Sequence, residues 1–539
     1  MGKASKKEKK TARRNQADPL SMGPPVVLSS AEIAKEQRQE AIPPILKKLS
    51  AASEDDRAWA ATALSNLVLD PESRRQLLAG NVIESLIALL TDLKLDVVVE
   101  GAGALRNLAV VGGEEVLSEI LRKHALTPLL ALIPKMSSWI AAHLSGTPAT
   151  TAASEPIAIG LVHSLAEQVI ALIWSLCESA DSAVRMVNSA GGGVVQFLLD
   201  LMNPTYLMPW KLVLVAAQCL HTLTEENEGL YPLFASNPLL THQLVSLAST
   251  PAEWTENRII LRVLSAAVLV NLRACVADQI AGGSAGIVDI AVRVVGDSLN
   301  YDIPGAIAEG AREADIIDKM PMPQATDGEE MDLNAVSSKE SASITTLESH
   351  MGTIQLALEL LANVYSDDLP EPDELVEDDD AVDDDAEDDD AFAMMQEDAE
   401  ILVAEDGEAP ASAPTAASAT SIPTVTLIER VAPLTRLPAR SASPSAAALA
   451  VAVGLVELRA LGCLTNLVSA AGPAWFDAQG DVRVMWDGIF EVAHAHAAAD
   501  PAAGVGLGGA GVEGVEGAVD VLWALARGVD ARKGKAGVI

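Results

Sequence analysis

The phrase Gly-Ala-Gly-Ala-Leu-Arg-Asn-Leu at residues 101–108 is one copy of a pattern that recurs along this chain of 539 residues. An earlier copy, Ala-Ala-Thr-Ala-Leu-Ser-Asn-Leu, occupies 60–67, and weaker copies follow at 169–176, 216–223, 266–272, 357–364, 459–467 and 521–526. The separation is 41 residues from Asn66 to Asn107, 47 from Ser175 to Thr222 and 49 from Thr222 to Asn271. Apolar positions within each copy recur at three and four residues, the period of a helix buried against neighbours. The pattern therefore indicates a tandem array of helical units.

A second phrase separates the copies: an acidic start, a short helix, a break of small residues and a Leu-rich helix. It covers 70–90, 114–133, 181–202 and 226–247, with breaks at Gly80-Asn81, near Ala125, at Gly191-Gly192-Gly193 and near Asn237-Pro238. Each unit is thus expected to hold two or three helices over roughly 40–50 residues, the period of armadillo and HEAT repeats. We predict an all-α solenoid in which each repeat rests on its neighbours. An ordinary helical bundle is the alternative, and the fixed period argues against it.

Changes in composition predict the organisation of the chain. We expect a disordered basic tail over 1–30, armadillo-like repeats over 31–300, a polar loop over 301–343, a repeat helix over 344–365, a disordered acidic and Pro/Ala/Ser-rich loop over 366–445, and HEAT-like C-terminal repeats over 446–539. A shorter insertion is expected from Ser137 to Glu155, and a last helix from Val515 to Arg527.

Aromatic residues make up only 3% of the chain and apolar residues 49%, so the core is expected to consist of Leu, Ala, Val and Ile. The four cysteines are far apart and fit small core residues in a reducing compartment. The charged N-terminus lacks the apolar segment of a signal peptide. The longest apolar stretch, Ala446 to Val456, is expected to be too short to span a bilayer, and no membrane partner is expected.

A dense acidic run interrupts the array. The chain has no Lys or Arg between Lys339 and Arg430, and the 22 acidic residues from Asp367 to Glu408 supply more than half of the net charge of −38. The centre of the run consists of Glu377, Asp378, Asp379, Asp380, Asp383, Asp384, Asp385, Glu387, Asp388, Asp389 and Asp390. Like charges of this density stay solvated and attract a strongly basic partner. The same charge argues against binding of a nucleic-acid backbone.

The N-terminal tail carries a candidate import signal. Its first fourteen residues have a net charge of about +6, and Arg14 is followed after four residues by Pro19-Leu20. Transportin-type import receptors recognise a basic cluster followed by Arg and a Pro-Tyr pair, of which Pro-Leu is a variant. The predicted signal residues are Lys6, Lys7, Lys9, Lys10, Arg13, Arg14, Pro19 and Leu20. A merely solubilising tail is the alternative.

The sequence gives no support for catalysis or a cofactor. The eight histidines are scattered, and His494-x-His496 lacks carboxylate partners at ligand spacing. The motif HExxH and the Walker loop are absent. The acidic run lacks the Gly and the spaced ligands of an EF-hand. We therefore expect no catalytic residue, no metal site and no cofactor.

The basic N-terminus with Arg-x4-Pro-Leu, the armadillo-like repeats and the long acidic loop together resemble the symportin family of fungal import adaptors. The opening Met-Gly-Lys, the 13–20 segment and the first repeats (41–69) carry the resemblance further, and it covers most of the chain to about residue 470. The Ala/Gly-rich C-terminal part is shorter than the run of HEAT repeats that the family leads one to expect.

The resemblance implies a transport adaptor and dedicated chaperone that is a monomer. It implies as partners two basic large-subunit ribosomal proteins of the 5S particle and a transportin-type receptor, with 5S rRNA contacted only indirectly. It implies movement between cytoplasm and nucleus, including the nucleolus. One cargo peptide is expected in the groove of the solenoid, and the acidic loop is expected to hold the other cargo. The groove candidates are Asn66, Glu100, Asn107, Glu178 and Asn271. As an alternative, an Asn at a helix interface packs or bonds a neighbouring backbone.

Three rival functions remain from the sequence. An adaptor of the importin-α kind carries Trp and Asn four residues apart on successive repeats, whereas here Trp59 and Asn66 are seven apart and Trp174 adjoins Ser175. A general armadillo scaffold usually has a basic groove and no acidic loop of this kind. An acidic histone chaperone is the third rival, because it attracts a strongly basic partner by negative charge in the same way as a carrier of ribosomal proteins.

Overall fold

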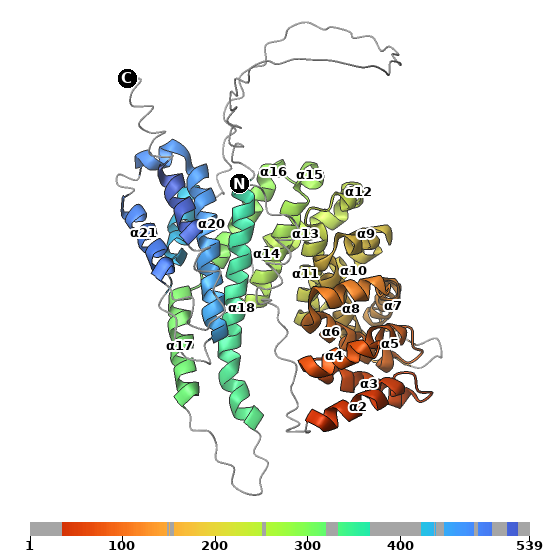
Figure 1. Ribbon diagram of the computed structural model, residues 1–539. Coiled ribbons are helices and arrows are strands. Elements are labelled where there is room, and N and C mark those ends of the chain that lie inside the picture. The colour runs from red at the N-terminus through yellow and green to blue at the C-terminus, as the bar shows by residue number, and fades with distance from the viewer. Residues whose placement is uncertain are drawn as a thin grey trace, which may run out of the picture.

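The computed structural model describes residues 35–147, 150, 156–250, 255–319, 333–366, 422–435, 437, 447–478, 483–498 and 515–526. Within these ranges the chain is helical, and the only extended pairing is an isolated bridge between Thr150 and Pro156. The helices stack in chain order from α2 to α16, and the long helices α18 and α20 run side by side beyond them (Figure 1). The predicted all-α solenoid is therefore confirmed.

The repeated phrase forms one helix in every unit. We call these helices the ladder, because each packs on the ladder helix before and after it. The ladder consists of α3 (Glu54–Leu67), α6 (Leu95–Arg122), α8 (Ile159–Ser179), α11 (Trp210–Thr224), α14 (Glu256–Asn271), α18 (Leu333–Ser366) and α20 (Ala447–Ala478). The first part of α6 belongs to the ladder, because Gly113 with φ 74° and ψ −173° divides that helix in two.

Pairs of further helices connect the ladder helices and cover them. They are α2 (Lys35–Lys48), α4 (Pro71–Ala79), α5 (Val82–Leu89), α7 (Leu126–Leu144), α9 (Asp181–Ser189), α10 (Gly193–Met202), α12 (Tyr231–Ser236), α13 (Pro238–Ser249), α15 (Arg273–Val276) and α16 (Gly283–Ser298), with short 3-10 turns η1 (Pro204–Tyr206), η2 (Glu228–Leu230) and η3 (Ala277–Gln279). The four breaks predicted from the second phrase fall between these helices, as expected.

The breaks have a common backbone geometry. Asn81 (φ 60°), His124 (φ 58°) and Gly191 (φ 82°) each lie in the left-handed region at the corner between a short helix and the next helix. A left-handed residue ends an α-helix by turning the chain away from it. Asp70 then begins α4 as its N-cap, because its side chain accepts a hydrogen bond from the Ser73 N–H at 2.8 Å. Local sequence thus sets the helix boundaries in successive units.

The core runs without interruption through the array. It consists mainly of Leu, Val, Ile and Ala from the ladder and the covering helices, and Phe234 is its one large aromatic among the fully buried side chains of the described residues. Cys177, Cys219 and Cys463 are buried and Cys275 is half-buried, and all four are free thiols. The prediction of an aliphatic core with structural cysteines is confirmed.

Two predicted loops contain helices. The polar segment 301–343 includes α17 (Ile303–Lys319) and the beginning of α18. Ile303, Ile307, Gly310 and Ala314 are buried at helical spacing, a stripe that the surrounding polar residues hid in the sequence. Helix α7 likewise continues to Leu144 and so includes the first eight residues of the expected insertion.

The expected acidic and Pro/Ala/Ser-rich loop also ends earlier than predicted. Helix α19 (Thr424–Val431) and the turn η4 (Ala432–Thr435) lie inside the segment 366–445 and pack on α20. Leu427, Ile428 and Val431 are buried there, and Arg430 Nη1 donates to the Gly296 carbonyl of α16 at 2.9 Å. The predicted loop residues 377–390 lie outside the described residues.

Two described helices are long and apolar enough, by length and composition, to cross a membrane: Ile159–Ser179 and Leu449–Ala471 within α20. Two bent pairs, α6 with α7 and α14 with the segment of α15 and η3, pass the same test only when each pair is counted as one span. The expectation that the longest apolar stretch, Ala446 to Val456, is too short to span a bilayer is therefore wrong by length and composition, because that stretch continues into Leu449–Ala471. In the array these helices pack on neighbours, with 50% and 56% of their tested residues buried. A helix that is apolar on most sides is suited to such a central position.

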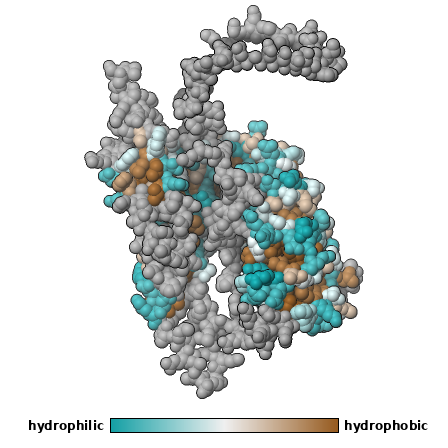
Figure 2. Space-filling model, viewed as in Figure 1, coloured by the Kyte–Doolittle hydropathy of each residue, from teal (hydrophilic) through white to brown (hydrophobic). Residues whose placement is uncertain are grey.

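The C-terminal end of the array leaves apolar side chains exposed. Helix α21 (Arg483–Ala498) and a helical segment at 515–526 follow α20, so the last predicted helix is present. Phe490 and Trp523 are 59% and 62% exposed on these helices. Figure 2 shows brown surface in this region and a second brown area among teal over the N-terminal units.

Candidate functional site

All five groove candidates lie on ladder helices. Asn66 is exposed on α3, Glu100 and Asn107 are half-buried on α6, Glu178 is half-buried near the end of α8, and Asn271 is half-buried at the end of α14. We call the partly exposed side of these helices the ladder face. The two other predicted sites, the import-signal residues 6–20 and the acidic residues 377–390, lie outside the described residues.

Three ladder asparagines hold neighbouring units together. Asn107 Nδ2 donates to the Ser65 carbonyl at 3.2 Å, and Asn271 Nδ2 donates to the His221 carbonyl at 3.5 Å. Asn466 Nδ2 donates to the Ala362 carbonyl at 2.9 Å. In each case the acceptor is a backbone carbonyl of the preceding ladder helix. It belongs to the residue just before the position that corresponds to the asparagine in the repeated phrase. Asn107 and Asn271 therefore bond a neighbouring backbone, the alternative that the sequence had left open.

Replacement of Asn107 by Ala is expected to lower the free energy of unfolding by about 1 kcal/mol, the typical contribution of one part-buried hydrogen bond. Asn66 is the matched control, because its amide has no hydrogen bond to any described residue. Asn66→Ala should change stability by less than about 0.5 kcal/mol. Urea unfolding of both variants measures the difference, and equal losses would contradict the inter-unit role of Asn107.

Two further contacts fix how adjacent ladder helices align. Thr62 Oγ1 donates to Glu100 Oε2 at 2.8 Å between α3 and α6. Lys211 Nζ lies 2.7 Å from Glu167 Oε1 between α11 and α8. Thr62 lies four residues before Asn66 and Glu100 seven before Asn107, whereas Glu167 lies eight before Ser175 and Lys211 eleven before Thr222. Both contacts have the same offset of three residues, which supports the alignment of Ser175 with the ladder asparagines.

Three polar residues of α8 and α11 were missed by the sequence analysis. Trp174 Nε1, Gln218 Oε1 and Gln168 Oε1 are buried atoms without a hydrogen-bond partner among the described residues. We call these three residues the polar cluster. A buried polar group without a partner is unfavourable. The three side chains are half-buried as a whole, so a rotation that presents these atoms to a ligand would give them a partner.

Gly103 of α6 lies beside Gln168, because a Cβ atom added to Gly103 would lie 4.0 Å from the Gln168 side chain. Gly103 lies four residues before Asn107 and Gln168 seven before Ser175, the same offset as between Thr62 and Glu100. The repeated phrase did not predict that polar atoms of the polar cluster are buried, because burial depends on the packing between helices.

A small acidic pocket lies at the other end of the first ladder helices. Its volume is about 150 Å³, and the residues around its mouth include Glu54 and Asp55 at the start of α3, Lys94 and Asp96 at the start of α6, and Leu161 of α8. Lys94 Nζ lies 3.5 Å from Glu54 Oε1, so one of three carboxylates is partly neutralised. The remaining charge favours a Lys or Arg side chain of a ligand.

The acidic segment is inserted between two consecutive ladder helices. Helix α18 ends at Ser366, α19 begins at Thr424, and α20 then packs along α18. Arg459 Nε of α20 lies 2.8 Å from Glu359 Oε1 of α18, which ties the two helices together. The array therefore holds the chain on both sides of the acidic segment. Among the described residues no group of three or more His, Cys, Asp and Glu side chains is arranged to hold a metal ion.

Stacked units built on a helical ladder define this chain as an armadillo and HEAT repeat solenoid. No protein-family model matches it. Over 233 residues it is 27% identical to the "Armadillo repeat protein involved in nucleocytoplasmic transport Syo2" of Schizosaccharomyces pombe, with 42% of this chain and 33% of that protein covered. Over 260 residues it is 27% identical to human "HEAT repeat-containing protein 3", with 48% and 36% covered.

These relatives confirm the resemblance to the symportin group that the sequence indicated. The chain spans about a third of the length of the curated relatives it matches. Among solved structures, a computationally designed armadillo repeat protein for modular peptide recognition matches with a TM-score of 0.35 and 16% identity, covering 48% of this chain and 93% of that protein.

Proposed function

We propose that this protein is an import adaptor that carries basic ribosomal proteins into the nucleus and chaperones them on the way. One cargo binds as an extended basic peptide along the ladder face. The acidic segment holds a second cargo, and both are basic large-subunit proteins of the 5S particle. The N-terminal tail engages a transportin-type receptor. The adaptor works as a monomer, and the complex moves from cytoplasm to nucleus and nucleolus.

The observation that carries the proposal is the insertion of the acidic segment between consecutive ladder helices of an armadillo array. If the run of like charge were on a free tail, its distance from a second binding surface would not be fixed. Here both of its ends are anchored on α18 and α19, so cargo held by the run stays beside the ladder face. The name of the Schizosaccharomyces pombe relative, which refers to nucleocytoplasmic transport, supports the same function.

The ladder face suits an extended basic peptide. The acidic pocket favours a basic side chain, and the polar cluster offers an indole N–H donor and two amide oxygen acceptors. A peptide backbone supplies the matching C=O and N–H groups at regular spacing. Peptide recognition of this kind takes its affinity from main-chain hydrogen bonds and its specificity from side-chain pockets.

Affinity purification of the endogenous protein tests the proposed function directly. Large-subunit ribosomal proteins of the 5S particle should be recovered together, in equal amounts. Treatment with ribonuclease should not remove them, because the RNA contact is indirect. Recovery of histones in place of ribosomal proteins would identify an acidic histone chaperone and contradict the proposal.

Substitution of the polar cluster is expected to weaken binding of the ladder-face cargo. Trp174→Ala with Gln218→Ala should raise the Kd for a basic peptide by about tenfold, since each change removes one contact worth roughly 0.5–1.5 kcal/mol. Trp486→Ala with Gln196→Ala changes the same residue types on α21 and α10 and should leave the Kd unchanged. Isothermal titration calorimetry measures both. Equal effects of the two pairs would remove the polar cluster from the binding surface.

The import signal is tested in cells. Replacing Arg14, Pro19 and Leu20 by Ala should leave a fluorescent fusion of the full chain cytoplasmic, because the apolar pair and its charge are lost together. The control replaces Val26, Val27 and Leu28, which lie outside the predicted signal. Continued nuclear accumulation of the first variant would show that the tail is not the signal.

A further inference from the structure

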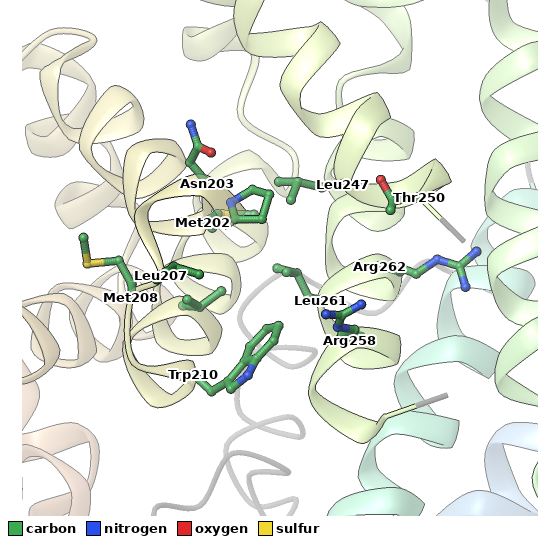
Figure 3. Close-up of a pocket in the computed structure, with 12 residues that line it drawn as sticks. Met202, Asn203, Leu207, Met208, Trp210, Leu247, Thr250, Arg258, Leu261 and Arg262 are labelled. Carbon is green, nitrogen blue, oxygen red and sulfur yellow. The ribbon is translucent and has the colours of Figure 1, made fainter. Parts of the chain in front are cut away.

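A second cavity lies away from the polar cluster, between the start of α11 and the start of α14. Its volume is about 430 Å³, within the range of roughly 300–1,000 Å³ typical of ligand sites. Its main lining residues are Met202, Leu207, Trp210, Leu247, Arg258 and Leu261. Figure 3 shows them converging from the α10–α11 connection on one side and from α13 and α14 on the other.

The walls combine exposed apolar surface with Arg258, a positive charge that pairs with no described residue. Leu207 is 87% exposed and has a left-handed backbone, with φ 49°, and Trp210 is 41% exposed. Arg262 in the wall is neutralised, because its Nη2 lies 2.8 Å from Asp297 Oδ2 and its Nε donates to the Ala248 carbonyl. The Arg258 side chain has no hydrogen bond or ion pair to any described residue. The cavity therefore suits an apolar side chain flanked by a carboxylate.

The acidic segment of this chain contains one stretch of that chemistry. Residues 388–398 read Asp-Asp-Asp-Ala-Phe-Ala-Met-Met-Gln-Glu-Asp, in which Phe392, Met394 and Met395 stand between carboxylates on both sides. Phe392 is one of only five phenylalanines in the chain. A charged run that serves only as a solvated tether does not need an aromatic residue and two methionines in its middle. Met and aromatic side chains are common anchors in apolar pockets.

The position where this segment rejoins the array brings it near the cavity. The first described residue after the segment is Ile422, whose side chain contacts Gly296 of α16. Gly296 adjoins Asp297, the ion-pair partner of Arg262 in the cavity wall. The 27 residues from Met395 to Ile422 span roughly 30 Å as a random coil. At that distance a tethered peptide has an effective concentration of about a millimolar.

We propose that this cavity is a docking site for Phe392–Met395 of the same chain. Phe392 and Met395 fill the apolar part between Trp210 and Leu261, and the flanking carboxylates pair with Arg258. Docking in this way holds the acidic run against the array at the α11–α14 junction. The proposal does not depend on which cargo the protein carries, and it differs from the ladder face in location and in the charge of the ligand.

Photocrosslinking tests the contact in the full chain. With Phe392 replaced by photoreactive p-benzoylphenylalanine, irradiation should give crosslinks within one chain to peptides containing 202–213 or 247–262, at a yield independent of protein concentration. The same photoreactive residue at Leu402 is the control and should give a yield at least several-fold lower. Crosslinks between two chains that grow with concentration would assign the cavity to a second copy and overturn the proposal. Crosslinks spread over the surface would also overturn it.

A competition experiment tests the chemistry. A fluorescent peptide of residues 386–400 is added to the full chain carrying Phe392→Ala, Met394→Ala and Met395→Ala. It should bind at least about tenfold more tightly than to the unchanged chain, whose own segment competes at high effective concentration. Adding Arg258→Glu to the triple variant should weaken peptide binding about tenfold, whereas Arg185→Glu on α9 should not. Equal binding to the triple variant and the unchanged chain would show that the cavity is empty and overturn the proposal.

Discussion

Replacement of the eleven acidic residues of 377–390 by Ser and Gly is expected to weaken binding of the basic cargo by roughly 100-fold at low salt, equivalent to about 3 kcal/mol. Ribosomal proteins are basic because they bind RNA, and the acidic run offers a comparable density of negative charge. Losing this charge slows encounter and removes contacts in the complex. The thermal stability of the array should not change, because the described core of the array is built from residues before 366 and after 421.

The salt dependence of cargo affinity distinguishes the loss of charge from a change in the conformation of the protein. The Debye length falls from about 10 Å at 0.1 M salt to 3 Å at 1 M, so the difference between the two proteins should nearly vanish at high salt. A third protein, with the order of residues 377–390 scrambled and the charge kept, should bind like the unchanged chain. Unaltered affinity of the neutralised protein in pull-down at moderate salt would rule out the run as a cargo-binding element.

The fold was predictable because each unit repeats the same sequence pattern and forms the same arrangement of helices. The phrase around Asn66 and Asn107 marks a helix that is buried against two neighbours, and its period gives the stacking direction. The breaks at Asn81 and Gly191 were visible because few residue types adopt the left-handed backbone there. Units with these local signals were assigned correctly from the sequence.

The remaining helices carry weaker local signals. In α17 a buried stripe of four residues lies among charged ones, and Pro304 in its first turn suggested a loop although Pro is well tolerated there. The eight residues of α19 pack on α20, and this contact stabilises the helix. The sequence alone does not show that contact. Tertiary contacts decided both cases.

The candidate site was predictable only in part. The repeated phrase correctly placed polar residues on the ladder, but Asn107 and Asn271 bond neighbouring units. Trp174 and Gln218 came to light only through the buried, unpartnered polar atoms of their side chains. Burial of such an atom depends on packing between helices, which the repeated phrase does not encode.

An ion pair between the first units is expected to make the largest single contribution to their stability. Arg57 Nε and Nη2 donate to Asp92 Oδ2 and Oδ1 at 2.7 and 2.9 Å, and the side chains are only 18% and 10% exposed. Arg57 Nη1 also donates to the carbonyls of Ala51 and Ala52. The pair joins the start of α3 to the corner before α6. Arg262 and Asp297 repeat the same separation of 35 residues between α14 and α16.

Asp92→Asn should therefore lower the local stability of α3 and α6 by about 2 kcal/mol, because it leaves a part-buried guanidinium without its counter-charge. Terminal units of a solenoid open before the middle ones, so the effect should be local. Amide hydrogen exchange in α3 and the first part of α6 is expected to accelerate roughly thirtyfold. Asp487→Asn on the exposed side of α21 is the control and should leave exchange in α3 unchanged.

The effect should also depend on pH in a defined direction. Burial raises the pKa of Asp92, but the hydrogen bonds from Arg57 and from the Lys94 backbone N–H lower it more, so the folded pKa lies below its usual value. A depressed carboxyl pKa contributes stability that is complete above the unfolded value of about 3.9 and is lost as the pH falls below it. The difference between the unchanged chain and Asp92→Asn should be constant from pH 5 to 7 and shrink below about pH 4. A difference that grows on acidification would contradict the ion pair as its cause.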